Sequence, residues 1–225
     1  MTIPELTRQE VEDGVRNGGN DLSQKRLSTL DLSGVDLSGV RLHGAYLNKA
    51  NLSKSTLRGT ILDQAWAMGA DFTGADLTEA SLFSSQMQGA NFAGAELSNA
   101  RVTADLSNAN LTGATLYRAD LGADMKNQSM GLVRAVLQSA RLDGADLRET
   151  NLNRVDLEFA SLKGADLRGA DLTGAFLAGA DLTGAKIAGA RFDGADVASV
   201  RLIDVTDEAE ADWTGARNVD RIRRK

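Results

Sequence analysis

A period of five residues runs through almost the whole chain and constrains the fold more than any other feature. A large apolar residue recurs at every fifth position, and a small residue stands two positions before it. In the first half of the chain the large residues are Leu27, Leu32, Leu37, Leu42, Leu47, Leu52, Leu57, Leu62, Phe72, Leu77, Leu82, Met87, Phe92, Leu97 and Val102. The repeated motif is A-(D/N)-L-(S/T/R)-G.

This period matches neither common secondary structure. A helix repeats every ~3.6 residues and a strand every ~2, so no long regular element could hold all the leucines on one face. The chain must therefore turn once in every unit. Within a unit the small and the large residue are two positions apart, so an extended segment points both of them inward. Glycine supplies the corner, and each side buries its apolar pair only because neighbouring coils cover it.

Several long runs of the motif resemble the pentapeptide-repeat family of bacterial proteins. The clearest are ADFTGADLTEASL, ADLSNANLTGATL and GADLRGADLTGAFLAGADLTGAKIAGARF, and the likeness covers about residues 21–202. It implies an all-β fold, a right-handed quadrilateral parallel β-helix with about 20 residues per coil and about nine coils. Columns drawn at that spacing would place Phe72, Phe92 and Phe192 on one face.

Three regions follow from where the repeat begins and ends. Residues 1–20 are predicted to form a helical N-terminal cap, with a short helix at residues 4–16 and Pro4 in its first turn. Residues 21–205 form the solenoid. Residues 206–225 form a C-terminal cap or tail, in which ADWTG at 211–215 resembles one more repeat with Trp213 as its large residue. Caps are expected because solenoid ends otherwise expose unpaired edges.

Two phase slips interrupt the solenoid. Val102 and Leu106 are four residues apart, and Leu121 and Leu132 are eleven apart. Because the slips cancel, both halves are predicted to stack in the same columns, with residues 122–131 leaving the rod as a loop. The loop is either a tolerated insertion or a partner contact. As a partner contact, it would offer Lys126, Asn127, Gln128 and Met130.

A few apolar residues stand where the repeat expects polar ones. They are Tyr46, Ile61, Trp66, Val136 and Phe176. Tyr46 and Trp66 are one coil apart, with Ile61 on the adjoining side, so these three are predicted to form an exposed partner-binding patch. The sequence leaves one alternative open. Ala67 occupies the position of a large core residue, and a local twist would then put Trp66 or Met68 inside.

The polar residues show no arrangement typical of catalysis or metal binding. The chain has no Cys and a single histidine, His43, and no cluster has the spacing of metal ligands. We therefore expect no enzyme activity, no catalytic residue, no cofactor and no metal. A column of Asp and Asn is expected to hydrogen-bond to backbone at the corners. This column comprises Asp31, Asn51, Asp71, Asn91, Asn110, Asn151 and Asp171.

Net charge and hydropathy limit the classes of partner that we expect for this chain. The net charge of −6 argues against direct binding of nucleic acid, since such proteins carry basic surfaces. No apolar run approaches the ~18 residues of a membrane span, and MTIPELTRQE lacks the features of a signal peptide. We expect a cytoplasmic protein without a membrane partner. Our leading hypothesis is a non-enzymatic protein-binding scaffold or regulator whose partner is unidentified.

The family resemblance implies an alternative function. One branch of the family mimics duplex DNA and protects DNA gyrase from topoisomerase poisons. A duplex carries about one charge per 1.7 Å of axis, far more than this chain, so mimicry would need a local acidic face. The candidate residues are Asp36, Asp76, Glu96, Asp156 and Asp196. That branch tends to form a homodimer through an apolar solenoid end, from which the charged tail here departs. The layout also resembles regulatory members in cyanobacteria, including a heterocyst-inhibiting one.

Overall fold

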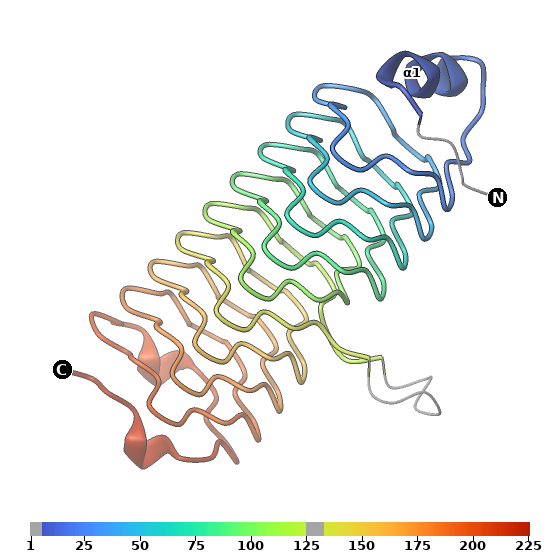
Figure 1. The fold of residues 1–225 in the computed structure, drawn as a ribbon. Helices are drawn as coiled ribbons and strands as arrows, with labels where there is room; N and C mark the ends of the chain where they lie inside the picture. Colours follow the sequence, from blue (N-terminus) through green and yellow to red (C-terminus); the bar gives the residue numbers. More distant parts are fainter. Residues whose placement is uncertain (1–5, 125–132) are drawn as a thin grey trace.

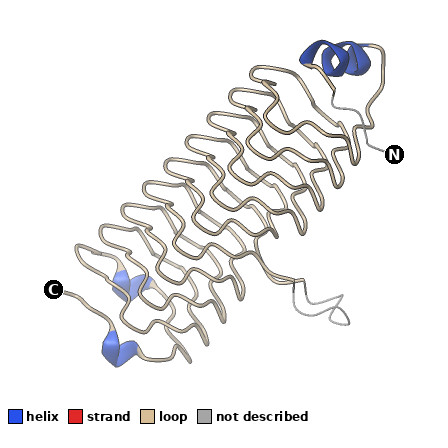
Figure 2. Ribbon diagram, in the orientation of Figure 1, coloured by secondary structure: helices blue, strands red, loops and turns tan. Residues whose placement is uncertain are grey.

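The computed structural model describes residues 6–124 and 133–225, which form a rod of stacked coils (Figure 1). Isolated parallel β-bridges join residues 20 positions apart, as between Asp21 and Arg41 and between Tyr46 and Trp66. Each such coil therefore holds four pentapeptide units. In the described residues the sides pair through single bridges and not through longer strands, so Figure 2 draws the rod as loop. The predicted solenoid is confirmed.

A residue with left-handed backbone forms the corner of most units. Glycine is common there, as at Gly34 with φ 69°, and Gln24 and Gln64 adopt the same conformation with φ 59°. The turn is closed by a backbone hydrogen bond between residues three positions apart, for example from the Ala45 N–H to the Leu42 oxygen (3.0 Å). A left-handed L-residue costs about 1–2 kcal/mol. That cost explains why the motif favours Gly at this position.

Backbone hydrogen bonds and buried apolar side chains hold the coils together. The Tyr46 N–H donates to the Lys25 oxygen in the coil before (2.9 Å), and the Leu47 N–H donates to the Trp66 oxygen in the coil after (2.6 Å). The large and small residues of each unit fill the interior. Phe72 and Phe92 stack there with ring centroids 4.7 Å apart. The interior is thus a solid ladder of side chains.

The outward residues of the bridges form four columns, which we number as faces 1 to 4. Face 1 holds Asp21, Arg41, Ile61, Ser81, Arg101, Asp120, Asn151, Asp171, Arg191 and Asp212. Face 2 holds Arg26, Tyr46, Trp66, Gln86, Asp105, Val136, Asp156, Phe176, Asp196 and Arg217. Face 3 holds Asp31, Asn51, Asp71, Asn91, Asn110, Arg141, Ser161, Asp181, Arg201 and Arg223. Face 4 holds Asp36, Thr56, Asp76, Glu96, Thr115, Asp146, Asp166 and Lys186.

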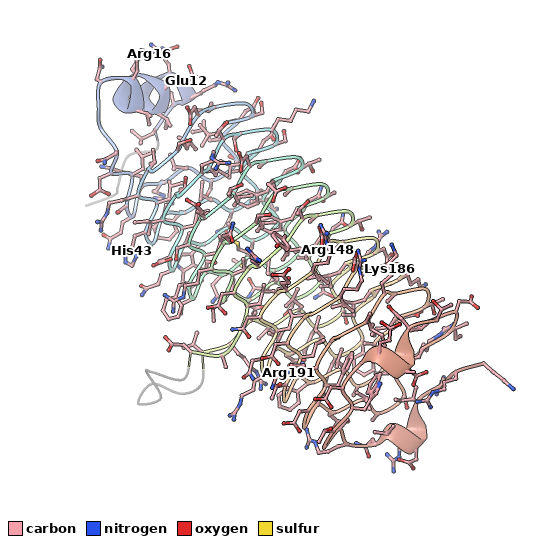
Figure 3. All side chains as sticks on the ribbon, turned by 180° about the vertical axis from the view of Figure 1, so that it is seen from behind. Glu12, Arg16, His43, Arg148, Lys186 and Arg191 are labelled. Atoms are coloured by element: carbon pink, nitrogen blue, oxygen red, sulfur yellow. The ribbon has the colours of Figure 1, made fainter. Side chains whose placement is uncertain are left out.

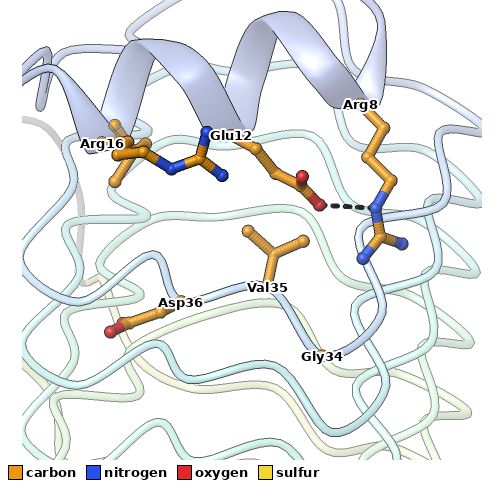
Figure 4. A pocket seen from close by; sticks show the side chains of 7 residues that line it. Arg8, Glu12, Arg16, Gly34, Val35 and Asp36 are labelled. Atoms are coloured by element: carbon orange, nitrogen blue, oxygen red, sulfur yellow. Dashed lines mark hydrogen bonds and ion pairs between the residues drawn. The ribbon is translucent and has the colours of Figure 1, made fainter.

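The helix α1 (Arg8–Arg16) covers the first coil. It begins later than the predicted residue 4, because Thr7 is the N-cap and forms a capping box with Glu10. Pro4 lies outside the described residues. Within the helix, Val11 is fully buried against the rod, and the Arg8 guanidinium donates to the Ser33 oxygen (3.0 Å). Figure 4 shows α1 lying across the end of the rod.

The C-terminal segment covers the other end. It contains two short 3₁₀ helices, η2 (Glu208–Glu210) and η3 (Val219–Arg221). Asp212, Arg217 and Arg223 continue the bridges of faces 1 to 3. Trp213 stacks on Phe192 with centroids 4.2 Å apart, so it occupies the large position of a further unit as the sequence suggested.

The central insertion shifts the columns by half a coil. Gln86 pairs with Asp105, 19 residues on, but Asp105 pairs with Val136, 31 residues on. The two slips cancel in the five-residue phase, yet together they leave the equivalent of two pentapeptide units, or two sides of a coil, outside the stack. The prediction that both halves share the same columns is therefore wrong. Phe192 lies on face 1, opposite Phe72 and Phe92 on face 3, and Asn151 and Asp171 leave the Asp/Asn column for face 1.

Engineered disulfides test this half-coil shift. Asn110→Cys with Arg141→Cys should crosslink on oxidation, because parallel neighbours lie ~4.8 Å apart, within the Cα separation that a disulfide tolerates. Asp120→Cys with Arg141→Cys is the matched control. That pair would be adjacent if the columns ran straight, but the structure places it on faces 1 and 3. Because the chain has no native Cys, non-reducing gels and mass spectrometry read the result directly. Crosslinking of the control pair alone would contradict the shift.

Candidate interaction face

Face 2 carries the aromatic patch that the sequence predicted. Tyr46 and Trp66 are bridge partners in successive coils and are 40% and 45% exposed. Ala67 is fully buried in the core, whereas Met68 is 39% exposed. Neither Trp66 nor Met68 turns inward, so the alternative of a local twist is wrong. Ile61 lies half-buried on the adjoining face 1, as predicted.

The half-coil shift adds two more of the apolar exceptions to face 2. Val136 and Phe176 lie below Tyr46 and Trp66 on this face. Phe176 is partly covered, because the Arg134 guanidinium stacks on its ring at 4.5 Å. Arg134 also approaches Asp156 at 3.8 Å. Phe176 and Asp156 together therefore hold the residue at which the insertion rejoins the rod.

The other end of the insertion is also anchored. Arg101 lies over the Phe83 ring at 3.9 Å and donates to Asp124 at 3.3 Å. The Asp124 N–H donates to the Val133 oxygen (2.8 Å), which closes the base of the insertion near the edge between faces 1 and 2. The candidates Lys126, Asn127, Gln128 and Met130 lie outside the described residues. Their contact with a partner stays a prediction.

Two exposed apolar side chains lie on the edge between faces 2 and 3, and the sequence analysis missed one of them. Phe159 is 67% exposed and occupies a corner where Gly is common, with φ 59°. Its ring lies over Gly179, where an added Cβ would be 2.7 Å from the ring. Met68 lies on the same edge. Phe159 is a large apolar residue at a corner position, whereas the exceptions predicted from the sequence all stand at the polar position of the motif.

A hollow of about 430 Å³ lies along the edge between faces 1 and 2. It is lined by Gln24, His43, Gly44, Tyr46, Gln64, Trp66, Ser84 and Gln86. None of these residues is Asp, Glu, Lys or Arg. Figure 3 shows that His43 projects from a different side of the rod than Arg148 and Lys186, which belong to the side of face 4. We call this hollow the aromatic groove.

A second hollow, of about 380 Å³, lies between α1 and the first coils (Figure 4). Its charged side chains already have partners. Arg8 pairs with Glu12 at 2.6 Å, and Arg16 pairs with Asp13 at 2.8 Å. This hollow is therefore part of the contact between the cap and the rod, and its charges are satisfied within the protein.

The five predicted acidic residues do not share a face. The first three, Asp36, Asp76 and Glu96, lie on face 4, whereas Asp156 and Asp196 lie on face 2, because the insertion shifts the second half of the chain. Asp146 and Asp166 take their places on face 4.

Hydrogen bonds lower the pKa of two face 4 carboxylates, Asp36 and Asp146. The Ser38 hydroxyl and backbone N–H hold the pKa of Asp36 below its ordinary value. The Arg148 guanidinium, which donates to Asp146 at 2.6 Å, likewise lowers the pKa of that carboxyl. Arg58 similarly pairs with Asp76 at 3.0 Å. Face 4 is thus acidic, but arginines at its edge offset part of its charge.

The corner role predicted for Asp and Asn is confirmed. Oxygens of Asp31, Asn51 and Asp71 each accept a hydrogen bond from the backbone N–H two residues later, at 2.9–3.0 Å. Across residues 6–124 and 133–225, no group of three or more His, Cys, Asp and Glu is arranged to hold a metal ion. The helices in that part of the chain are too short or too polar to cross a membrane.

The family comparison agrees with this geometry. The sequence model of the family described as pentapeptide repeats matches residues 26–64, 68–99, 104–127, 132–169 and 160–197, which is more than half of the chain. The chain belongs to the pentapeptide repeat family. No curated protein matches it significantly.

Two solved structures of this family are similar to the chain. HetL from the cyanobacterium Nostoc sp. strain PCC 7120, involved in heterocyst differentiation regulation, is 29% identical. The match covers 97% of this chain and 95% of HetL, with a TM-score of 0.50. A trypsin-treated variant of QnrB1, a plasmid-mediated fluoroquinolone resistance protein, is 17% identical over 85% of this chain and 88% of its own, with a TM-score of 0.57. The QnrB1 likeness supports the fold alone.

Fluorescence quenching tests the outward position of Trp66. In a Trp213→Phe variant, Trp66 is the only tryptophan, and acrylamide should quench it strongly because the indole is 45% exposed. In Trp66→Phe the remaining Trp213 is stacked on Phe192, so its quenching constant should be smaller. An equal or smaller constant for Trp66 would show that its ring is inside the rod.

Proposed function

We propose that this member of the pentapeptide repeat family is a non-enzymatic protein-binding scaffold or regulator. In this proposal the chain is a rigid right-handed rod of about nine four-sided coils, and face 2 binds the partner. The observation that carries the proposal is the clustering of apolar side chains. All four large apolar side chains that are exposed in the described residues, Tyr46, Trp66, Met68 and Phe159, lie on face 2 or its edge with face 3.

The other features of face 2 support this proposal. Exposed aromatic and Met side chains are enriched at protein interfaces, where a few anchors supply most of the binding energy. The coil-to-coil hydrogen bonds hold the face rigid, so binding orders little of the backbone. The similarity to HetL over nearly the whole chain is consistent with a regulatory role.

A capture experiment with matched variants tests the role of face 2. The full chain and the Tyr46→Ala/Trp66→Ala variant are used as bait under native conditions, and retained proteins are quantified by mass spectrometry. The amount of a specific partner that is retained should fall by at least about tenfold with the variant, since interface anchors contribute about 2 kcal/mol or more each. Thr56→Ala/Thr115→Ala on face 4 is the control and should capture as the unchanged chain does. No specific partner, or a partner that is insensitive to the face 2 variant, would contradict the proposal.

Mimicry of DNA is a second candidate function, and face 4 is the surface that favours it. Five carboxylates lie in this one column: Asp36, Asp76, Glu96, Asp146 and Asp166. Asp76 pairs with Glu96, and Asp146 pairs with Asp166, in successive coils ~4.8 Å apart. The column is therefore closer to a regular row of charge than the set predicted from sequence. The arginines at the edge and the absence of a carboxylate at Thr56 and Thr115 weaken the likeness to a duplex.

A gyrase supercoiling assay tests this second candidate. If face 4 mimics DNA, the protein should inhibit supercoiling or rescue it from a quinolone, and Asp146→Asn/Asp166→Asn should weaken that effect because it removes two charges from the row. Asp171→Asn/Asp212→Asn on face 1 is the control for net charge. No inhibition and no rescue over a titration of the protein would end the candidate.

A further inference from the structure

The corner side chains along the aromatic groove alternate between long and short. Going down the edge between faces 1 and 2, the left-handed positions are Gln24, Gly44, Gln64 and Ser84. Equivalent positions two coils apart are separated by about 9.6 Å, because neighbouring coils lie ~4.8 Å apart. The groove therefore has two amide side chains two coils apart, each followed by a shorter corner residue, and the Gln24 side chain extends over Gly44, where an added Cβ would be 3.5 Å from its Cγ.

Five polar side chains of the groove are available to a ligand, whereas Gln86 already accepts a hydrogen bond from Gln88. The side chains of Gln24, Gln64 and His43, the Tyr46 hydroxyl and the Trp66 indole N–H make no hydrogen bond within the described residues. By contrast, the backbone beneath them is already used. The Tyr46 N–H and the Trp66 N–H both donate to the coil before, at 2.9 Å. A partner peptide consequently cannot add to this face as a further β-strand, and must bind through side chains.

The shape and chemistry of the groove match a polyproline II helix. This helix has about three residues per turn and a rise of ~3.1 Å per residue, so it repeats every ~9.3 Å, close to the two-coil repeat of the groove. It has no internal hydrogen bonds, so its carbonyls can accept from the Gln amides, Tyr46 and Trp66. An α-helix satisfies its own backbone and has a pitch of ~5.4 Å, which does not match the alternation. The lack of charged lining residues favours an uncharged segment.

We propose that the aromatic groove binds an uncharged, proline-rich segment of a protein in polyproline II conformation. The prolines would sit against Tyr46 and Trp66, beside the shorter corners at Gly44 and Ser84, as aromatic-lined grooves commonly bind such helices. This inference rests on the proposed function, because it names the part of the partner that face 2 holds.

A peptide titration tests the ligand class. The probe is a blocked peptide of about twelve residues of repeated Ala-Pro-Pro, with repeated Ala-Gly-Gly as the control that lacks a preformed helix. Calorimetry on the full chain should give a dissociation constant below about 1 mM for the proline peptide only. In Trp213→Phe, emission from Trp66 should shift on binding. An amphipathic helical peptide and maltoheptaose are titrated in parallel as alternative occupants.

Lengthening a shorter corner residue tests the spacing. Gly44→Gln should fold, because Gln24 and Gln64 already hold Gln at the same φ, and it would convert the alternating row into a continuous one. We expect Gly44→Gln and Trp66→Ala each to weaken binding of the proline peptide at least about tenfold. Gly39→Gln, at a corner between faces 4 and 1 with open space around it, is the matched control and should bind as the unchanged chain does.

The outcomes separate this inference from the proposed function. Loss of binding in Gly44→Gln and Trp66→Ala, with binding kept in Gly39→Gln, supports the inference. If the proline peptide does not bind but partner capture still depends on Tyr46 and Trp66, the ligand class is wrong and the proposed function stands. A shift in Trp66 emission with the helical peptide or with maltoheptaose, but not with the proline peptide, also overturns the inference of a proline-rich ligand. If neither peptide binding nor capture is seen, both proposals fail.

Discussion

The left-handed corner that closes every fifth residue is the constraint on which the rest of this structure depends. It turns the chain by one side per unit, so the small and large residues always point inward and the residue between them always points outward. The coil-to-coil hydrogen bonds then form without regard to the outward side chain, as the bonds at Tyr46 and Trp66 show. A large aromatic residue at the outward position leaves the core and the backbone ladder intact. The outward and corner positions are therefore where this fold can carry recognition.

Much of the fold could be predicted from the five-residue phase, but the arrangement of the two halves could not. The phase identifies which residues are buried, and Leu106 and Leu137 are both in the core as the grid requires. It does not say how many whole units the chain spends away from the rod. An insertion that places two whole units outside the stack leaves the five-residue phase unchanged, as does one that places none outside. The misplacement of Phe192, and of Asp156 and Asp196 in the acidic set, has this single cause.

The candidate site was partly predictable for a related reason. Tyr46 and Trp66 precede the insertion and are 20 residues apart, so a local count was enough to put them side by side. Val136 and Phe176 follow the insertion, and their place on the same face depends on where the chain re-enters the stack. Ala67 made the direction of Trp66 ambiguous, because a small core residue and a large neighbour offer two ways to fill the interior. The backbone ladder decides between them, since turning Trp66 inward would break the alternation that its neighbours share.

The insertion and face 2 are physically linked, and this limits how the insertion could vary. Arg134 reaches Phe176 and Asp156 only because the chain re-enters the rod on the side that places all three residues together. One pentapeptide more or less outside the stack would move Phe176 to an adjoining face and separate Tyr46 and Trp66 from the apolar residues below them. Changes in the insertion that are not multiples of a whole coil would therefore divide the face, although the core would still pack. An interruption of the repeat thus joins two halves of one surface, which gives the aromatic groove and the anchored insertion a common edge.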